Sequence, residues 1–334
     1  MNSTVCTPEL AQSIRSLAAR LGYVACGFTR AEPLNAFSKA LDDRVQRFPD
    51  AAPLYEQMRH RADPTRTAPW AKSMVVCIRY YGTYRVPESL DGHIGRNYLF
   101  DRRCAECPEH DMARSMTAGM RELGLKVKKG GVPDRLAAVK AGVARLGRNG
   151  FAFLGDYGSW INIATWRVDA ELPPNEPSTD CPCPPNCRAC IDACPTHAIA
   201  APYCVRIDRC VAYLTYHAQH PIAPDLWKRM GSWIYGCDEC QLVCPLNREA
   251  WQGRKRADWL EKRLPYLTPE ALSRMDASTY RTFVHPLFWY IPLNAPERWR
   301  ANAQRALNAG RTSRRDPEPS RRTALPDALK ESRD

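Results

Sequence analysis

The chain has 334 residues, 44% hydrophobic and 25% charged, a composition typical of a soluble globular protein with about two domains. No segment approaches the roughly 20 apolar residues that span a bilayer, and residues 1–21 lack the basic stretch and apolar core of a secretion signal. These features exclude a membrane protein and predict a cytoplasmic one. The formal net charge of +12 fits either a solvated surface with a basic tail or a polyanionic or acidic partner.

The first 172 residues contain segments with the periodicities of helices and of strands. Apolar side chains recur at helical spacing over residues 9–21, and Gly22 then ends the helix. β-Branched and aromatic residues run together over 73–81, which predicts a buried strand. The other predicted elements are a strand over 23–29, helical segments over 35–62 interrupted near Pro49 and Pro53, helices over 111–123 and 133–141, and a turn and strand over 157–168. This mixture predicts an α/β (α+β) domain over 1–172.

The second half of the chain changes in composition. Residues 173–180 form a proline-rich linker, and the predicted second domain, rich in cysteine, spans 173–250. Helical patterning returns within 251–310, at 269–275, 277–282 and 296–309. Residues 311–334 are rich in Arg, Pro, Ser and Asp with little to bury, so we expect this basic tail to be disordered.

Seven of the fifteen cysteines lie in two runs that each end in Cys-Pro, over residues 183–195 and 237–245. In a cytosolic chain, clustered CxxC spacings indicate metal sites rather than disulfides. In two-cluster ferredoxins the cysteine before the proline binds the other [4Fe–4S] cluster. Applied to this chain, that rule assigns Cys183, Cys187, Cys190 and Cys244 to the first cluster, and Cys194, Cys210, Cys237 and Cys240 to the second.

Alternatives remain for some cysteines. Three residues, rather than two, separate Cys183 from Cys187, so Cys181 is an alternative first ligand. A zinc site would favour two CxxC pairs, often with histidine, which these runs do not resemble. The lone CxxC formed by Cys104 and Cys107 is a weak signal, compatible with two ordinary cysteines at the start of a helix.

The residues around the cysteines resemble the epoxyqueuosine reductase family, which is related to reductive dehalogenases. The resemblance lies in residues 187–199, 207–215 and 235–248, and more loosely in 22–29, 141–150 and 158–160. It implies a nitroreductase-like corrinoid-binding domain, a ferredoxin-like domain with two [4Fe–4S] clusters, and a short helical C-terminus. It further implies an oxidoreductase with a cobalamin that receives single electrons from a low-potential donor such as flavodoxin or ferredoxin.

In that family, the glycine-rich loop would lie against the corrinoid. Gly142, Gly147 and Gly150 have no Cβ, so their backbone could approach a flat macrocycle, and Asn149 could offer its amide. A loop that serves only as a helix cap and turn remains the alternative.

The resemblance also implies an aspartate that donates a proton, placed before the helix that precedes this loop. The ungapped position falls in residues 126–130, Lys-Val-Lys-Lys-Gly, which offer no acid. The candidates are Asp134, Tyr98 and Asp101. Asp134 could instead complement the helix dipole, and Tyr98 could be a buried structural tyrosine.

The missing aspartate leads us to expect an iron–sulfur oxidoreductase that removes oxygen or halide from a substrate other than tRNA. One alternative is a genuine tRNA epoxyqueuosine reductase. Members of that family continue into helical repeats that hold tRNA, whereas this chain has one short helical segment and an Arg-rich tail. The other alternative is an electron-transfer or activator protein without its own substrate.

Overall fold

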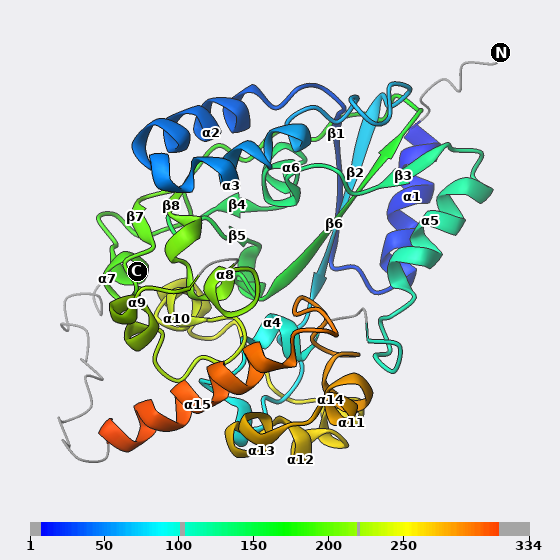
Figure 1. The fold of residues 1–334 in the computed structure, drawn as a ribbon. Coiled ribbons are helices and arrows are strands. Elements are labelled where there is room, and N and C mark those ends of the chain that lie inside the picture. Colours follow the sequence, from blue (N-terminus) through cyan, green and yellow to red (C-terminus); the bar gives the residue numbers. More distant parts are fainter. Residues whose placement is uncertain (1–7, 101–103, 219–220, 314–334) are drawn as a thin grey trace, which may run out of the picture.

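The computed structural model describes residues 8–100, 104–218 and 221–313. Asp101 and residues 314–334 of the predicted disordered tail lie outside these ranges, whereas residues 311–313 of that predicted tail continue the last helix. An antiparallel sheet with helices on both faces forms one end of the molecule, and the cysteine-bearing loops and the C-terminal helices form the other (Figure 1).

The main sheet has four strands in the order β1-β2-β6-β3, and every neighbouring pair is antiparallel. The strands are β1 (Ala25–Arg30), β2 (Ser73–Tyr80), β3 (Val127–Lys129) and β6 (Ile161–Val168). β2 lies between β1 and β6 and is buried along its whole length. This burial explains why β2 has an almost continuous run of apolar residues rather than an alternating pattern.

Helices cover both faces of the sheet because the apolar side chains of β2 point alternately to each side. Val75 and Cys77 pack in a core with α1 (Pro8–Arg20) and α5 (Met112–Glu122). Met74, Val76 and Ile78 pack in a second core with α6 (Asp134–Lys140). The helices α2 (Asn35–Arg47) and α3 (Ala52–Glu56) extend from the α6 side toward the cysteine loops (Figure 1).

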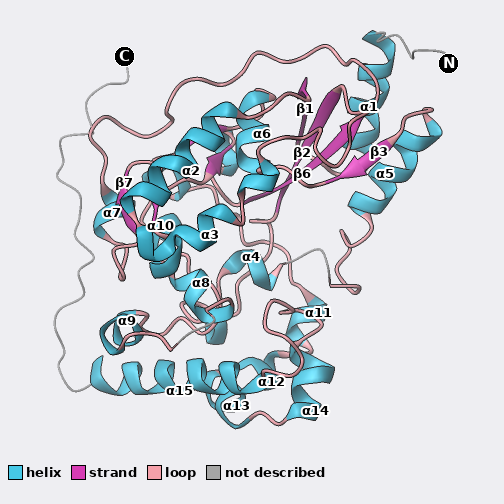
Figure 2. Ribbon diagram, turned by 45° about the horizontal axis from the view of Figure 1, so that its top comes forward, coloured by secondary structure: helices cyan, strands magenta, loops and turns pink. Residues whose placement is uncertain are grey.

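Short elements carry the cysteines, and the C-terminal segment consists of short helices followed by the long helix α15 (Figure 2). Two hairpins pair β4 (Arg145–Leu146) with β5 (Ala152–Phe153) and β7 (Ile199–Ala201) with β8 (Cys204–Val205). The remaining helices are α4 (Arg96–Leu99), α7 (Ala189–Asp192), α8 (Val211–Tyr216), α9 (Pro224–Arg229), α10 (Glu239–Leu242), α11 (Asp258–Glu261), α12 (Leu264–Leu267), α13 (Pro269–Arg274), α14 (Ala277–Thr279) and α15 (Pro296–Ser313). No helix of the described residues is long and apolar enough to cross a membrane.

The C-terminal helices share one hydrophobic core with the N-terminal part of the chain. Tyr81 and Trp160 pack in this core with Trp259 of α11 and Trp299 of α15. The side chain of Asn302 on α15 also donates to the backbone carbonyls of Thr215 and Ile234, at 2.9 and 3.0 Å. The segment 251–310 is therefore built into the fold that supports the cysteine loops.

The predicted mixture of helices and strands is confirmed, and the boundaries of α1, β2, α5 and α6 lie within one or two residues of the predicted ranges. β1 begins at Ala25 rather than Tyr23, because Gly22, with a φ of 88°, turns the chain after α1. The three-residue β3 was not predicted, since its sequence Val-Lys-Lys has no strand pattern of its own. A specific likeness to nitroreductases stays a prediction.

Candidate iron–sulfur site

The two cysteine runs have the same local build. In each run a four-residue helix, α7 or α10, carries one cysteine, and the Cys-Pro pair follows within two residues of the helix end. α7 and α10 pack against each other. Cys194 and Cys244 therefore leave adjacent helices, which is the arrangement that lets each of them reach toward the other run.

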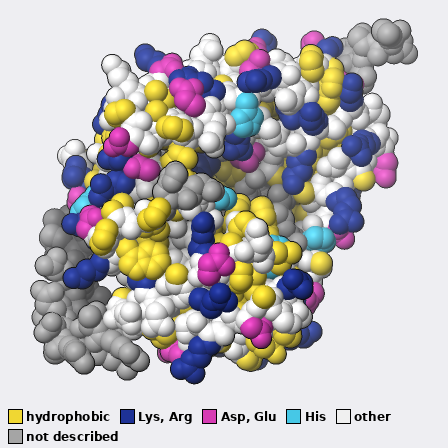
Figure 3. All heavy atoms as spheres, in the orientation of Figure 1, with side chains coloured by type: hydrophobic (Ala, Val, Ile, Leu, Met, Phe, Trp, Pro, Cys, Tyr) yellow, Lys and Arg dark blue, Asp and Glu magenta, His cyan; other side chains and the backbone are white. Residues whose placement is uncertain are grey.

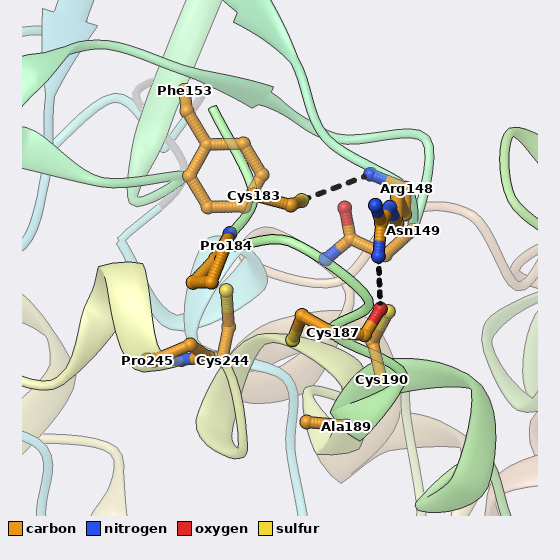
Figure 4. Close-up of a pocket in the computed structure, with 10 residues that line it drawn as sticks. All are labelled: Arg148, Asn149, Phe153, Cys183, Pro184, Cys187, Ala189, Cys190, Cys244 and Pro245. Atoms are coloured by element: carbon orange, nitrogen blue, oxygen red, sulfur yellow. Dashed lines mark hydrogen bonds between the residues drawn. The ribbon is translucent and has the colours of Figure 1, made fainter. Parts of the chain in front are cut away.

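The first predicted group of cysteines surrounds one cavity. Cys183, Cys187, Cys190 and Cys244 line one small cavity, together with Arg148 and other residues (Figure 4). Burial raises the pKa of Cys183 to about 11 and also raises the pKa of Cys190 and Cys244. Thiolates in such a place need a compensating cation. The donor set therefore fits an iron–sulfur cluster.

Cys181, the alternative first ligand, lies elsewhere. It is exposed and does not line the cavity, whereas the sulfur of Cys183 accepts a hydrogen bond from the Arg148 backbone N–H at 3.4 Å. Although burial opposes it, hydrogen bonds from the Tyr203 hydroxyl and the Cys183 backbone lower the pKa of Cys181. The geometry favours Cys183 as the ligand.

The second predicted group also converges. Cys194, Cys210 and Cys240 pack in one small cluster of side chains together with Cys190 of the first group. Cys237 lies close enough to Cys240 and Cys210 for their ionised forms to raise its pKa. Burial raises the pKa of Cys237 and Cys240 well above the usual range for thiols. Among the described residues no three His, Cys, Asp or Glu side chains are grouped as ligands of one metal ion. The thiols of a four-iron cluster stand farther apart than that, because the cluster lies between them.

The glycine-rich loop is the tip of the β4–β5 hairpin. The Gly147 N–H donates to the Phe151 carbonyl at 2.9 Å, and Gly150 adopts a φ of 77°, which favours glycine. A Cβ on Gly147 would lie 2.4 Å from the Phe153 ring, and one on Gly142 would lie 2.3 Å from the Glu176 carbonyl oxygen. These glycines thus allow close contacts within the chain itself.

Asn149 joins this loop to the cysteine region. Its side-chain amide is buried, donates to the Cys240 carbonyl at 3.2 Å and accepts from the Phe151 N–H at 3.0 Å. Of the four predicted corrinoid contacts, Gly142, Gly147 and Asn149 therefore make close contacts within the protein, whereas a Cβ on Gly150 would meet Val205 at an ordinary 3.8 Å. Gly142 is exposed and Gly150 is half-buried, and corrinoid binding by the four residues stays a prediction.

A second polar connection links the two parts of the chain. Asn247, which follows the second Cys-Pro pair, donates to the Ser159 hydroxyl and the Gln241 carbonyl at 2.8 and 2.9 Å, and accepts from the Ser159 N–H at 2.8 Å. A Cβ on Gly158 would lie 2.2 Å from the Asn247 side-chain oxygen. The residues Gly158-Ser159-Trp160 are thus locked to the loop that carries Cys244.

We expect Asn247→Ala to lower the free energy of unfolding by about 3 kcal/mol, because several buried groups lose their hydrogen-bond partner. Chemical denaturation of the cluster-loaded protein measures this change. Asn308→Ala is the matched control, since Asn308 is exposed, and should change stability by less than about 0.5 kcal/mol. Equal effects of the two substitutions would contradict the role given to Asn247.

The proposed proton donors lie in different surroundings. Tyr98 packs against Gly236, next to Cys237, and its hydroxyl forms a 2.8 Å hydrogen bond with the Tyr216 hydroxyl. Burial raises the pKa of Tyr98 well above the usual range, and the neighbouring Tyr216 adds to that effect. Asp134 is the first residue of α6, where the helix dipole favours a carboxylate. Asp101 lies outside the described residues.

Three residues of this region were missed from the sequence. Arg148 contacts the first group of cysteines, and Tyr216 pairs with Tyr98. Arg135 donates to the Gly150 carbonyl at 2.9 Å, and its charge acts on Cys210 and Cys240. Arg148 could have been noticed as the cation within the glycine loop, whereas Tyr216 and Arg135 carry no sequence signal.

The fold and these cysteines define a double-cluster iron–sulfur protein, and comparisons with known proteins agree. Residues 183–247 match the model of the 4Fe-4S double cluster binding domain. The chain is 30% identical to an epoxyqueuosine reductase of Cellulophaga algicola over 246 residues, 70% of this chain and 78% of that protein. It is also 30% identical to the epoxyqueuosine reductase of Xanthomonas campestris over 305 residues, 83% of each chain.

A solved structure shows the same fold. The crystal structure of an epoxyqueuosine reductase with an epoxyqueuosine-modified tRNA-Tyr stem loop matches with a TM-score of 0.69 at 22% identity, over 90% of this chain and 81% of that one. The chain belongs to the epoxyqueuosine reductase family, a family of oxidoreductases. The family predicted from the cysteine motifs is thereby confirmed.

Proposed function

We propose that this protein reduces epoxyqueuosine in tRNA to queuosine, and that electrons reach the substrate through two [4Fe–4S] clusters. The observation that carries the proposal is the convergence of two groups of four cysteines in a member of this family. This is the function that the sequence suggested as an alternative, and the similarity to the reductases supports it better than an unrelated substrate. The related structure with a bound tRNA stem loop supports a tRNA partner.

The reaction defines what the chain must supply. Removal of an epoxide oxygen as water consumes two electrons and two protons. Clusters held by the eight cysteines would supply the electrons singly, from an external low-potential donor such as flavodoxin or ferredoxin. Tyr98 is our candidate proton donor, since its hydroxyl is paired with Tyr216 and its ring packs against Gly236, next to Cys237. The family resemblance implies a cobalamin that would carry these electrons to the substrate, and its binding by Gly142, Gly147, Asn149 and Gly150 stays a prediction.

The charge of the protein is compatible with tRNA but does not define its site. The formal net charge is +12, and phosphate contacts supply much of the affinity of proteins for nucleic acids. On the face in Figure 3, however, Lys and Arg side chains are scattered among acidic ones rather than gathered in one patch. Recognition of tRNA by this chain would therefore depend on contacts to the modified base as well as on charge.

A different substrate is the second candidate. The place where the family resemblance implies an acidic proton donor lies in β3, which carries Lys128 and Lys129. The Lys128 amine donates to the Thr67 carbonyl at 2.7 Å on the surface. An enzyme with lysines there and a tyrosine as proton donor would suit a substrate with another leaving group.

The test is complementation of a bacterial strain that lacks epoxyqueuosine reductase, with the modified nucleosides of its tRNA measured by mass spectrometry. We expect queuosine to replace epoxyqueuosine when the intact chain is expressed, but not when Cys240→Ala is expressed. If the intact chain carries about eight irons and epoxyqueuosine persists, the tRNA substrate is wrong and the second candidate stands.

A further inference from the structure

Arg148 is the charged side chain that lines the cavity of the first group of cysteines. Its backbone N–H donates to the Cys183 sulfur at 3.4 Å, and its guanidinium donates to the Cys187 carbonyl at 2.7 Å (Figure 4). Arg148 thus contacts two predicted ligands, Cys183 through its backbone and Cys187 through its side chain. The hairpin tip that the glycines shape is what brings Arg148 to this position.

The charge of Arg148 is directed at this group of cysteines. Within the group it acts on Cys190, whereas the arginine that acts on Cys210 in the second group is Arg135. Among the described residues no carboxylate forms an ion pair with Arg148, although Arg145, three residues earlier, pairs with Asp180 at 2.8 Å. The positive charge beside the first group is therefore not neutralised by a carboxylate in contact with it.

We propose that Arg148 raises the reduction potential of the first cluster, and so sets how readily that cluster accepts an electron. The inference rests on the two clusters of the proposed function, not on its tRNA substrate. When the cluster is reduced it gains one electron from the donor, and no covalent bond is made or broken. A nearby cation and an N–H···S hydrogen bond both stabilise the added negative charge.

Protein-film voltammetry of the reconstituted protein tests this inference, because two clusters give two waves. In Arg148→Gln we expect one wave to move to lower potential, with about a tenfold lower ratio of reduced to oxidised cluster at a fixed potential, equivalent to ~59 mV for one electron. The other wave should stay in place. Arg20→Gln is the control, because this substitution removes the same charge at a distant place. Arg20 lies exposed on α1, away from the cysteine loops (Figure 1).

Arg148→His gives an independent version of the test. In this variant the reduction potential of the first cluster should fall as pH rises through the titration of the imidazole, since only the protonated ring replaces the lost charge. This fall should exceed any change of the same potential in the wild type. Iron content of about eight per chain confirms that each variant is loaded. Unmoved waves in both variants, or an equal shift in Arg20→Gln, would overturn the inference. No tRNA is present, so this outcome is separate from that of the substrate test.

Discussion

Replacing Cys183 by alanine is expected to lower the iron content of the anaerobically reconstituted protein from about eight to about four irons per chain, because one cluster loses a ligand. Cys183 lines the cavity with Cys187, Cys190 and Cys244, and the Arg148 N–H fixes its sulfur. Colorimetric iron analysis measures the loss, and electron paramagnetic resonance of the reduced protein should show the remaining cluster without its magnetic partner.

Cys181→Ala is the matched control for this experiment. The two cysteines are separated only by Pro182, but Cys181 is exposed and outside the cavity. This variant should retain about eight irons and both reduced-cluster signals. If Cys181→Ala loses about four irons and Cys183→Ala keeps all eight, Cys181 rather than Cys183 is the ligand of the first cluster. Bound zinc in the wild type would end the iron–sulfur interpretation altogether.

Tyr98→Phe should lower the turnover of the reductase about a hundredfold, the lower end of what a positioned proton donor contributes. Burial, reinforced by Tyr216, raises the pKa of Tyr98 above its usual range. The sign follows directly: a raised pKa extends the protonated, donating form to higher pH, so ionisation of Tyr98 should not limit activity up to about pH 9. Single-turnover reduction of an epoxyqueuosine-modified stem loop measures the effect.

Two further variants give this prediction its control. Tyr55→Phe removes a hydroxyl that donates to the Val205 carbonyl at 3.1 Å and accepts from the Ile207 N–H at 3.3 Å, bonds that involve neither Tyr98 nor Tyr216, and should leave turnover within a few-fold of the wild type. Asp134→Asn tests the rival donor at the start of α6. A hundredfold loss in Asp134→Asn with little change in Tyr98→Phe would transfer the role to the aspartate. Iron content should stay constant in all three variants.

Local patterns were enough to predict much of the fold. The apolar run correctly predicted β2, which is buried on both faces. The helical spacing of apolar residues correctly predicted α1 and α5, which are buried along one stripe. β3 and the order of the strands were not predicted. Pairing of β3 with β6 depends on contacts between residues about forty positions apart, which no local pattern records.

The glycine loop shows where interpretation by residue type is ambiguous. Glycine indicates only that another group approaches the backbone closely. A macrocycle and a segment of the protein chain both require the absence of a Cβ at such a position. The structure places the Phe153 ring and the Glu176 carbonyl at those positions. Asn149 was likewise selected for its amide, and that amide binds the Cys240 carbonyl.

The amino-acid sequence by itself was enough to identify the family and to predict the composition of the two cysteine groups, because ligand spacing along short loops is a local property that cluster geometry constrains tightly. Tertiary structure alone decided what surrounds them. Tyr216 lies beside Tyr98, Arg148 lies over Cys183, and Cys181 is left outside. These relations join side chains 35 to 118 residues apart, and only the packing of the hairpin, α4 and α8 around the cysteine loops brings them together.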